Sequence, residues 1–113
     1  MSRGFEGYIE SGKRSLRQLQ EYREVARKVR GIAEKAWPAC KVYVFGSVLE
    51  GRYTAASDID ILIVVDRVGR EEAAKVKAMI LHAVDAPVEL HVASNEEFEG
   101  WYRRFIDKLE EIA

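Results

Sequence analysis

Two short apolar runs joined by a polar insert constrain the fold of this chain more than any other feature. The first run covers residues 42–45 and the second covers residues 59–65, and both are rich in β-branched and aromatic residues. Short runs of this composition with turn residues between them predict two strands of one sheet. Since 113 residues suffice for one hydrophobic core but not for two, we expect a single domain over residues 1–113.

Two aspartates open the second run. Asp58 and Asp60 flank Ile59, and because side chains alternate along a strand, both carboxylates should lie on one face about 7 Å apart. Two carboxylates at the mouth of a buried strand are costly unless a cation lies between them. Mg²⁺ or Mn²⁺ suits such a position, because these ions take oxygen ligands and keep several waters. The alternative is a pair of turn or capping carboxylates.

Gly46 and Ser47 follow the first predicted strand. Glycine allows the backbone to approach a ligand closely, and the serine hydroxyl and the following amides can donate hydrogen bonds to phosphate oxygens. The two apolar runs therefore bring a candidate phosphate site and a candidate metal site into one region of the sequence.

The order of these motifs is similar to that of a known family. Gly46-Ser47, ten further residues and then Asp58-x-Asp60 resemble the signature of the DNA polymerase β-type nucleotidyltransferase superfamily, most closely its minimal nucleotidyltransferases. The resemblance covers about residues 40–92, the expected catalytic core. It implies an α/β (α+β) fold, a small mixed sheet with packed helices. It also implies that Asp58 and Asp60 hold Mg²⁺ or Mn²⁺ against a bound NTP while Ser47 binds its phosphates.

The resemblance also assigns a role to a third carboxylate. Residues 88–92 alternate between apolar and polar side chains, which predicts a third strand with Glu89 and His91 on the face opposite its apolar residues. The family carries a third acidic residue, usually aspartate, on a strand next to the second. Glu89 matches that position and would join Asp58 and Asp60 in metal binding and catalysis. His91 is either an ordinary packed or exposed side chain or a further ligand.

The loop after the Gly-Ser motif departs from the family pattern. Many relatives carry a basic residue before the second glycine, whereas here Glu50 precedes Gly51 and Arg52 follows it. Two interpretations of Arg52 remain open: it binds a nucleotide phosphate, or it pairs with Glu50.

Periodic apolar positions predict the helices. Steps of three and four residues define an amphipathic helix over about residues 15–37, which either covers the sheet or forms a homo-oligomer interface. A helical turn is expected over residues 47–51 and a second amphipathic helix over residues 70–84. A C-terminal helix over about residues 95–110 should begin with a capping box formed by Ser94 and Glu97.

Composition limits the cellular setting. No apolar run is long enough to span a bilayer, and the N-terminus lacks the apolar segment of a signal peptide, so a cytoplasmic protein is expected. Many charged residues with few amide side chains suggest a thermophilic source. The first 52 residues are more basic than the rest, but their acidic residues are interleaved and their aromatic residues lie on the apolar stripe. Direct nucleic-acid binding is therefore the weakest hypothesis.

Two functions of different classes follow. The first is a Mg²⁺-dependent enzyme that transfers NMP, with AMP from ATP favoured, to an acceptor hydroxyl. The resemblance implies that this acceptor belongs to a HEPN-type all-helical partner protein in a toxin–antitoxin pair. The alternative is a catalytically degenerate module of the same fold that binds NTP or the partner. Glu89 in place of aspartate and the altered loop around Arg52 are the features that favour the alternative.

Overall fold

A four-stranded mixed sheet in the order β3-β2-β1-β4 forms the centre of the protein. The structure is a computed structural model that describes the backbone of residues 2–113 and the side chains of residues 6–113. The strands are β1 (Lys41–Phe45), β2 (Ile59–Val65), β3 (Val88–Ser94) and β4 (Glu110–Ile112). The helices are α1 (Ser2–Gln20), α2 (Tyr22–Ala36), α3 (Ser47–Glu50), α4 (Arg70–Ala83), α5 (Asn95–Glu97), the π-helical turn η1 (Phe98–Tyr102) and α6 (Arg103–Phe105). The predicted fold class, a mixed sheet with packed helices, is confirmed.

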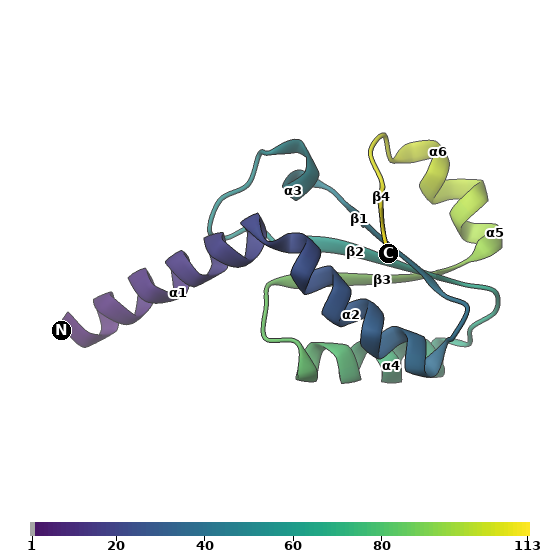
Figure 1. Cartoon of the computed structure of the whole chain (residues 1–113), viewed down its shortest axis with the longest axis horizontal. Helices are drawn as coiled ribbons and strands as arrows, with labels where there is room; N and C mark the ends of the chain where they lie inside the picture. Colours follow the sequence, from purple (N-terminus) through teal and green to yellow (C-terminus); the bar gives the residue numbers. More distant parts are fainter. Residues whose placement is uncertain (1) are drawn as a thin grey trace.

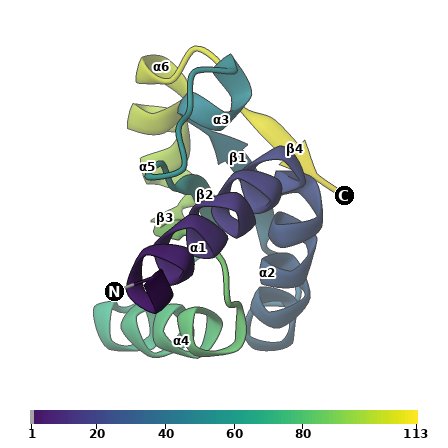
Figure 2. The same cartoon turned by 90° about the vertical axis from the view of Figure 1, so that its left-hand side faces the viewer.

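Strand β2 is buried on both faces. Its isoleucines and Val65 pack against α2 and α4, whereas Leu62 and Val64 pack against residues 95–105, the C-terminal helical segment. Figures 1 and 2 show these helices in two layers, with the sheet between them. Asp60 is the only residue of β2 that is not buried, and it lies on the face of the C-terminal helical segment. The strand that the sequence marks most clearly thus has one polar position at its beginning.

The connections between the strands follow from their spacing. A short insert joins β1 to β2 as antiparallel neighbours, and α4 provides the longer crossover that parallel β2 and β3 require. The predicted third strand continues to Ser94, where the capping box with Glu97 forms as expected. Among the residues that the structure describes, no helix is both long and apolar enough to cross a membrane.

The prediction of one N-terminal helix over residues 15–37 is wrong. The helix breaks at Glu21, whose backbone angles are φ −99° and ψ 34°, and α1 continues away from the sheet (Figure 1). On one side of the break, Arg14 and Gln18 donate hydrogen bonds to the backbone carbonyl of Asp85. On the other side, α2 packs on the sheet. The apolar spacing is regular across the break, so periodicity alone does not locate it.

The prediction of a C-terminal helix over residues 95–110 is correct only for its first part. The helical segment contains the wide turn η1 and ends at Phe105, and residues 110–112 form β4 against the free edge of β1. A π-helical turn shifts the positions that share a face. As a result Phe98 is buried, while Trp101 and Phe105 pack on each other and are exposed.

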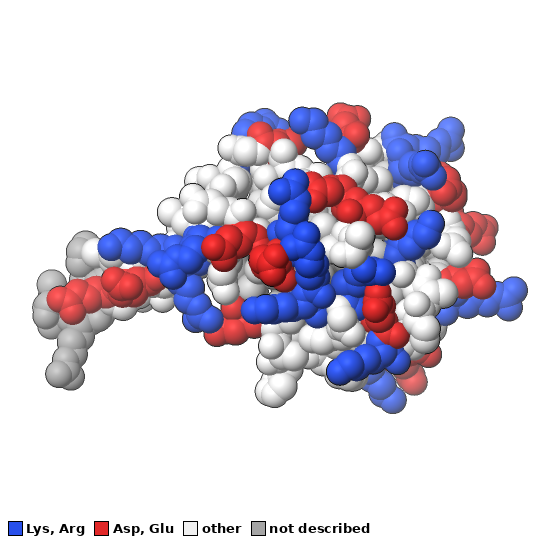
Figure 3. All heavy atoms as spheres, in the orientation of Figure 1, with Lys and Arg blue, Asp and Glu red and all other residues white. Residues whose placement is uncertain are grey.

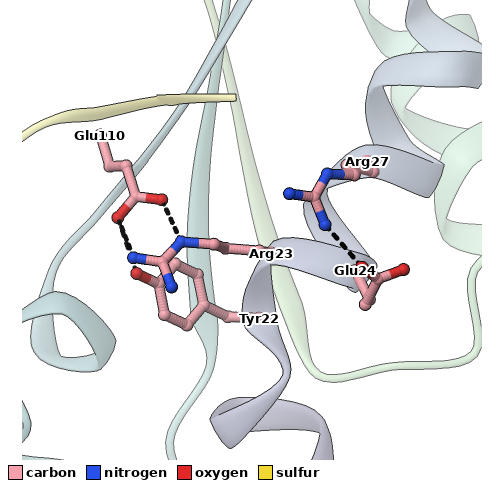
Figure 4. A network of polar contacts seen from close by, with 5 residues as sticks. All are labelled: Tyr22, Arg23, Glu24, Arg27 and Glu110. Carbon is pink, nitrogen blue, oxygen red and sulfur yellow. Dashed lines mark hydrogen bonds and ion pairs between the residues drawn. The ribbon is translucent and has the colours of Figure 1, made fainter. Parts of the chain in front are cut away.

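A polar network holds β4 against α2. The Tyr22 hydroxyl donates to Glu110 Oε1 at 2.7 Å, and Arg23 donates to both carboxylate oxygens, through Nε at 2.6 Å and Nη2 at 3.0 Å. Figure 4 shows both side chains directed at Glu110, with the neighbouring Arg27–Glu24 pair on the same helix. The hydrogen bond from Arg23 lowers the pKa of the Glu110 carboxyl. This network fixes a C-terminal strand of only three residues.

Candidate active site

Three side chains with metal-ligating atoms meet where β2 and β3 begin. One ligand atom from each of Asp60, Glu89 and His91 lies within 4.8 Å of the other two, and we call this group the Asp60 cluster. The parallel register places Asp60 opposite Glu89 and Leu62 opposite His91. Since alternate residues share a face, both β3 side chains lie on the face of Asp60. The alternation in the sequence predicted the face on which Glu89 lies, and the family resemblance predicted its position beside the second strand.

His91 completes the cluster. Its Nε2 lies 3.7 Å from Asp60 Oδ1 and 4.0 Å from Glu89 Oε1, beyond hydrogen-bond distance in both cases. Within the part of the chain that the structure describes, this atom is enclosed and has no hydrogen-bond partner. The Phe45 ring packs against the imidazole with a centroid separation of 5.3 Å. A buried polar atom without a partner carries a desolvation cost, so the position favours a ligand that can bind the nitrogen.

The environment of Asp60 opposes its negative charge. Burial is the largest cause of a raised pKa at this carboxyl, and the negative charge of Glu89 adds to it, while His91 acts in the opposite direction. The Asp60 side chain is 24% exposed, so water screens it only partly. A cation bound among these groups would favour the ionised carboxylate. The electrostatics of the site and its donor atoms therefore favour the same kind of ligand, a cation.

Gly46 lies directly against Asp60. Phe45, the last residue of β1, pairs with Asp60, and the chain then turns at Gly46 with φ +85°. A Cβ atom at residue 46 would overlap Asp60 Oδ2 and would lie 3.2 Å from the carboxylate carbon. Both the backbone angle and the contact require glycine here. The Gly-Ser motif thus brings the end of β1 next to the Asp60 cluster, and Ser47 follows as the first residue of α3.

Two other predicted site residues lie outside the cluster. Asp58 is exposed and precedes β2, whose first residue, Ile59, donates its N–H to the Pro87 carbonyl at 2.7 Å. Arg52 is exposed and pairs with Glu50 at 2.9 Å, the second of the two interpretations that the sequence left open. The structure thus brings Gly46, Asp60 and Glu89 together but not Asp58 or Arg52.

A hollow of about 210 Å³ adjoins the candidate phosphate site. It is lined by Gly46, Glu50 and residues 105–108. The apolar periodicity predicted a helix through residues 105–108, so the position of these residues beside the Gly-Ser motif was not predicted.

Comparisons with known proteins identify the family of the chain. A family model described as a nucleotidyltransferase domain matches residues 26–113. A crystal structure of a candidate nucleotidyltransferase is 30% identical, with a TM-score of 0.65 over 77% of this chain and 96% of that one. A candidate nucleotidyltransferase from Sulfolobus solfataricus is 23% identical, with a TM-score of 0.56 over 91% of this chain and 83% of that one, which supports the fold alone. A search of curated proteins gave no match.

Proposed function

Because this chain belongs to the nucleotidyltransferase domain family, we propose that it transfers NMP from an NTP, with ATP as the first candidate, to a hydroxyl group of an acceptor. The observation that carries the proposal is the Asp60 cluster beside Gly46. In the reaction, the acceptor oxygen bonds to the α-phosphorus and loses its proton, the bond to the β-phosphate breaks, and pyrophosphate leaves. This chemistry needs positioning and charge stabilisation but no protein nucleophile.

The donor atoms fit a divalent cation. Two carboxylates and an unpartnered imidazole nitrogen lie close together, and burial together with the negative charge of Glu89 raises the pKa of Asp60. Asp60 and Glu89 would hold Mg²⁺ or Mn²⁺, and Asp58 would add a carboxylate from the position before the strand. When bound, such an ion neutralises negative charge on the phosphates during in-line displacement.

The residues between β1 and β2 would hold the triphosphate. Gly46 leaves room for a phosphate to approach the backbone, and the Ser47 hydroxyl would donate to an oxygen of the leaving pyrophosphate. Arg52 pairs with Glu50 on the surface, where an ion pair contributes little, so it is free to exchange this partner for a phosphate. These groups would restrain the nucleotide so that its α-phosphorus faces the acceptor.

Recognition of the acceptor would come from another protein. The described residues form the sheet and the helices packed on it. Helix α1 projects from the body (Figure 1) and exposes Tyr8 and Ile9. This surface supports a role for α1 in contact with a HEPN-type all-helical partner, as in a toxin–antitoxin pair, or with a second copy of the chain. Figure 3 shows acidic and basic side chains interspersed over α1 and α2, which does not favour a nucleic acid as the partner.

A second function of the same fold is binding without turnover. The observation that favours it is the position of Asp58 and Arg52 outside the cluster. In this case the protein would bind NTP or the partner and release no pyrophosphate with any acceptor.

Transfer of label from an α-labelled NTP tests the proposal, with the co-purified partner or a second copy as acceptor. Asp58→Asn and Asp60→Asn should each abolish transfer. Asp66→Asn changes an exposed aspartate at the other end of β2 and should leave transfer intact. Unchanged transfer in the Asp60 variant would refute the proposed site. Nucleotide binding without transfer in the wild type would support the non-catalytic function.

A further inference from the structure

We propose that His91 is a direct metal ligand through Nε2, and that this nitrogen makes the site select first-row transition-metal ions such as Mn²⁺ over Mg²⁺. The inference rests on the proposed function in one respect, the location of the metal at the Asp60 cluster. It goes further because it assigns a nitrogen donor and a metal preference.

The distances place Nε2 within reach of a shared ion. Two donors can contact one ion only if they are closer than twice the metal–donor bond length, about 4.2 Å for bonds of about 2.1 Å. The Nε2 atom meets this limit with both partners, at 3.7 Å from Asp60 and 4.0 Å from Glu89. The same distances are too long for hydrogen bonds.

The surroundings of the imidazole favour ligation over an ion pair. Nε2 makes no hydrogen bond to either carboxylate, although both lie within 4.0 Å of it. The ring is 30% exposed, but Nε2 itself is enclosed and is close to both carboxylates. Phe45 packs against the ring and restricts its rotation. A neutral ring presents one nitrogen as an acceptor, which is the form that binds metals.

The donor type determines the selectivity. Mg²⁺ prefers oxygen ligands, whereas an imidazole nitrogen adds affinity for first-row transition metals, with the smallest gain for Mn²⁺. A site with two carboxylates and one imidazole should therefore bind Mn²⁺ more tightly than an all-oxygen site does, with little gain for Mg²⁺.

Electron spin echo spectroscopy of bound Mn²⁺ tests the ligand directly. The chain has only two histidines, and the other one, His82, is exposed on α4, on the opposite side of the sheet. With Mn²⁺ below the protein concentration and no affinity tag, His82→Gln should keep an imidazole ¹⁴N coupling, and His91→Gln should lose it. His91→Gln should also lower the affinity for Mn²⁺ by a larger factor than the affinity for Mg²⁺, which is measured by competition.

The His82→Gln protein carries the decisive measurement, because it leaves the proposed ligand intact and does not depend on the folding of a site variant. Suppose that Asp60→Asn weakens Mn²⁺ binding but that the bound Mn²⁺ shows no ¹⁴N coupling. This result would overturn the role of His91 and leave the proposed metal site intact. Equal losses of Mn²⁺ and Mg²⁺ affinity in His91→Gln would overturn the selectivity. Mn²⁺ binding that Asp60→Asn does not weaken would refute the metal site itself.

Discussion

The Asp60 carboxylate occupies the space that a side chain at residue 46 would need. Gly46 therefore does more than close a turn, because its missing Cβ allows the end of β1 to lie beside the carboxylate of the neighbouring strand. This contact joins the Gly-Ser part of the sequence motif to its Asp-x-Asp part. Any larger residue at position 46 must move either the turn or Asp60.

Gly46→Ala should destabilise the protein more than Gly51→Ala. Both glycines have positive φ, but Gly46, with φ +85° and ψ −158°, lies in a region that essentially only glycine adopts, whereas Gly51, with φ +70° and ψ 14°, is left-handed and costs alanine about 1–3 kcal/mol. Only the residue 46 variant adds an overlap with Asp60, since a Cβ at Gly51 meets nothing within 4 Å. Urea denaturation of the two variants measures the combined cost of the backbone angles and the overlap at residue 46. Equal losses of stability would show that the Gly46–Asp60 contact is unimportant.

Asp60→Asn should stabilise the metal-free protein at neutral pH. The pKa of Asp60 is raised, so the folded state holds its proton more tightly than the unfolded chain, and ionisation of Asp60 costs stability above the raised value. The advantage of the variant should shrink as the pH falls through the raised pKa and vanish below the ordinary value of 3.8. The measurement is the free energy of unfolding against pH with a chelator present.

A bound metal should make the wild type more stable than Asp60→Asn. Mn²⁺ should raise the unfolding temperature of the wild type and have little effect on Asp60→Asn, because the variant lacks the central carboxylate. A variant that is less stable than the wild type in chelator would contradict the electrostatic account of Asp60.

Glu110→Gln should destabilise the protein at neutral pH and have little effect in acid. Arg23 lowers the folded-state pKa of Glu110, so its contribution is present above the unfolded value of 4.5 and is lost as the pH falls through the folded value. High salt should also weaken the effect, because both partners are partly exposed. Thermal unfolding at several pH values, with Glu111→Gln at an exposed neighbouring position as control, measures it. A difference that persists in acid would indicate a packing effect instead.

Ile112→Ala should cost about 2–5 kcal/mol, the usual range for a buried isoleucine. Ile112 is 4% exposed and pairs with Val42 at the edge of the sheet. Leu81→Ala, at a side chain that is 51% exposed, should change stability by less than about 0.5 kcal/mol. Similar effects of the two variants would mean that β4 adds little to the core.

The sequence predicted the centre of the molecule better than its ends. The first three strands and the face on which Glu89 lies followed from alternation and β-branched composition, which are local signals. The break at Glu21 and the strand β4 depend on contacts between residues far apart in sequence, such as the network that joins Arg23 to Glu110. Local periodicity carries no information about such contacts.

In the candidate site too, local sequence signals predicted some features, while others depend on contacts between distant residues. The motif located Gly46 and Asp60, but their mutual contact depends on the register of β1 against β2. His91 was left open because a single histidine on a strand is uninformative until the register places it beside Asp60 and Glu89. The partner of Arg52 could not be predicted either, because the sequence is compatible with an ion pair to Glu50 and with a contact to a bound phosphate.

Thermal unfolding with each of the four NTPs, with and without Mg²⁺ or Mn²⁺, tests the central claim most directly. A ligand that binds only the folded state stabilises it by RT ln(1 + [L]/Kd), about 2.7 kcal/mol at a hundredfold excess over Kd. We expect a metal-dependent rise in unfolding temperature with one NTP, and its loss in Asp58→Asn and Asp60→Asn. No rise with any NTP and metal, or a rise that survives in Asp60→Asn, would contradict the assignment of the Asp60 cluster as a nucleotidyltransferase site.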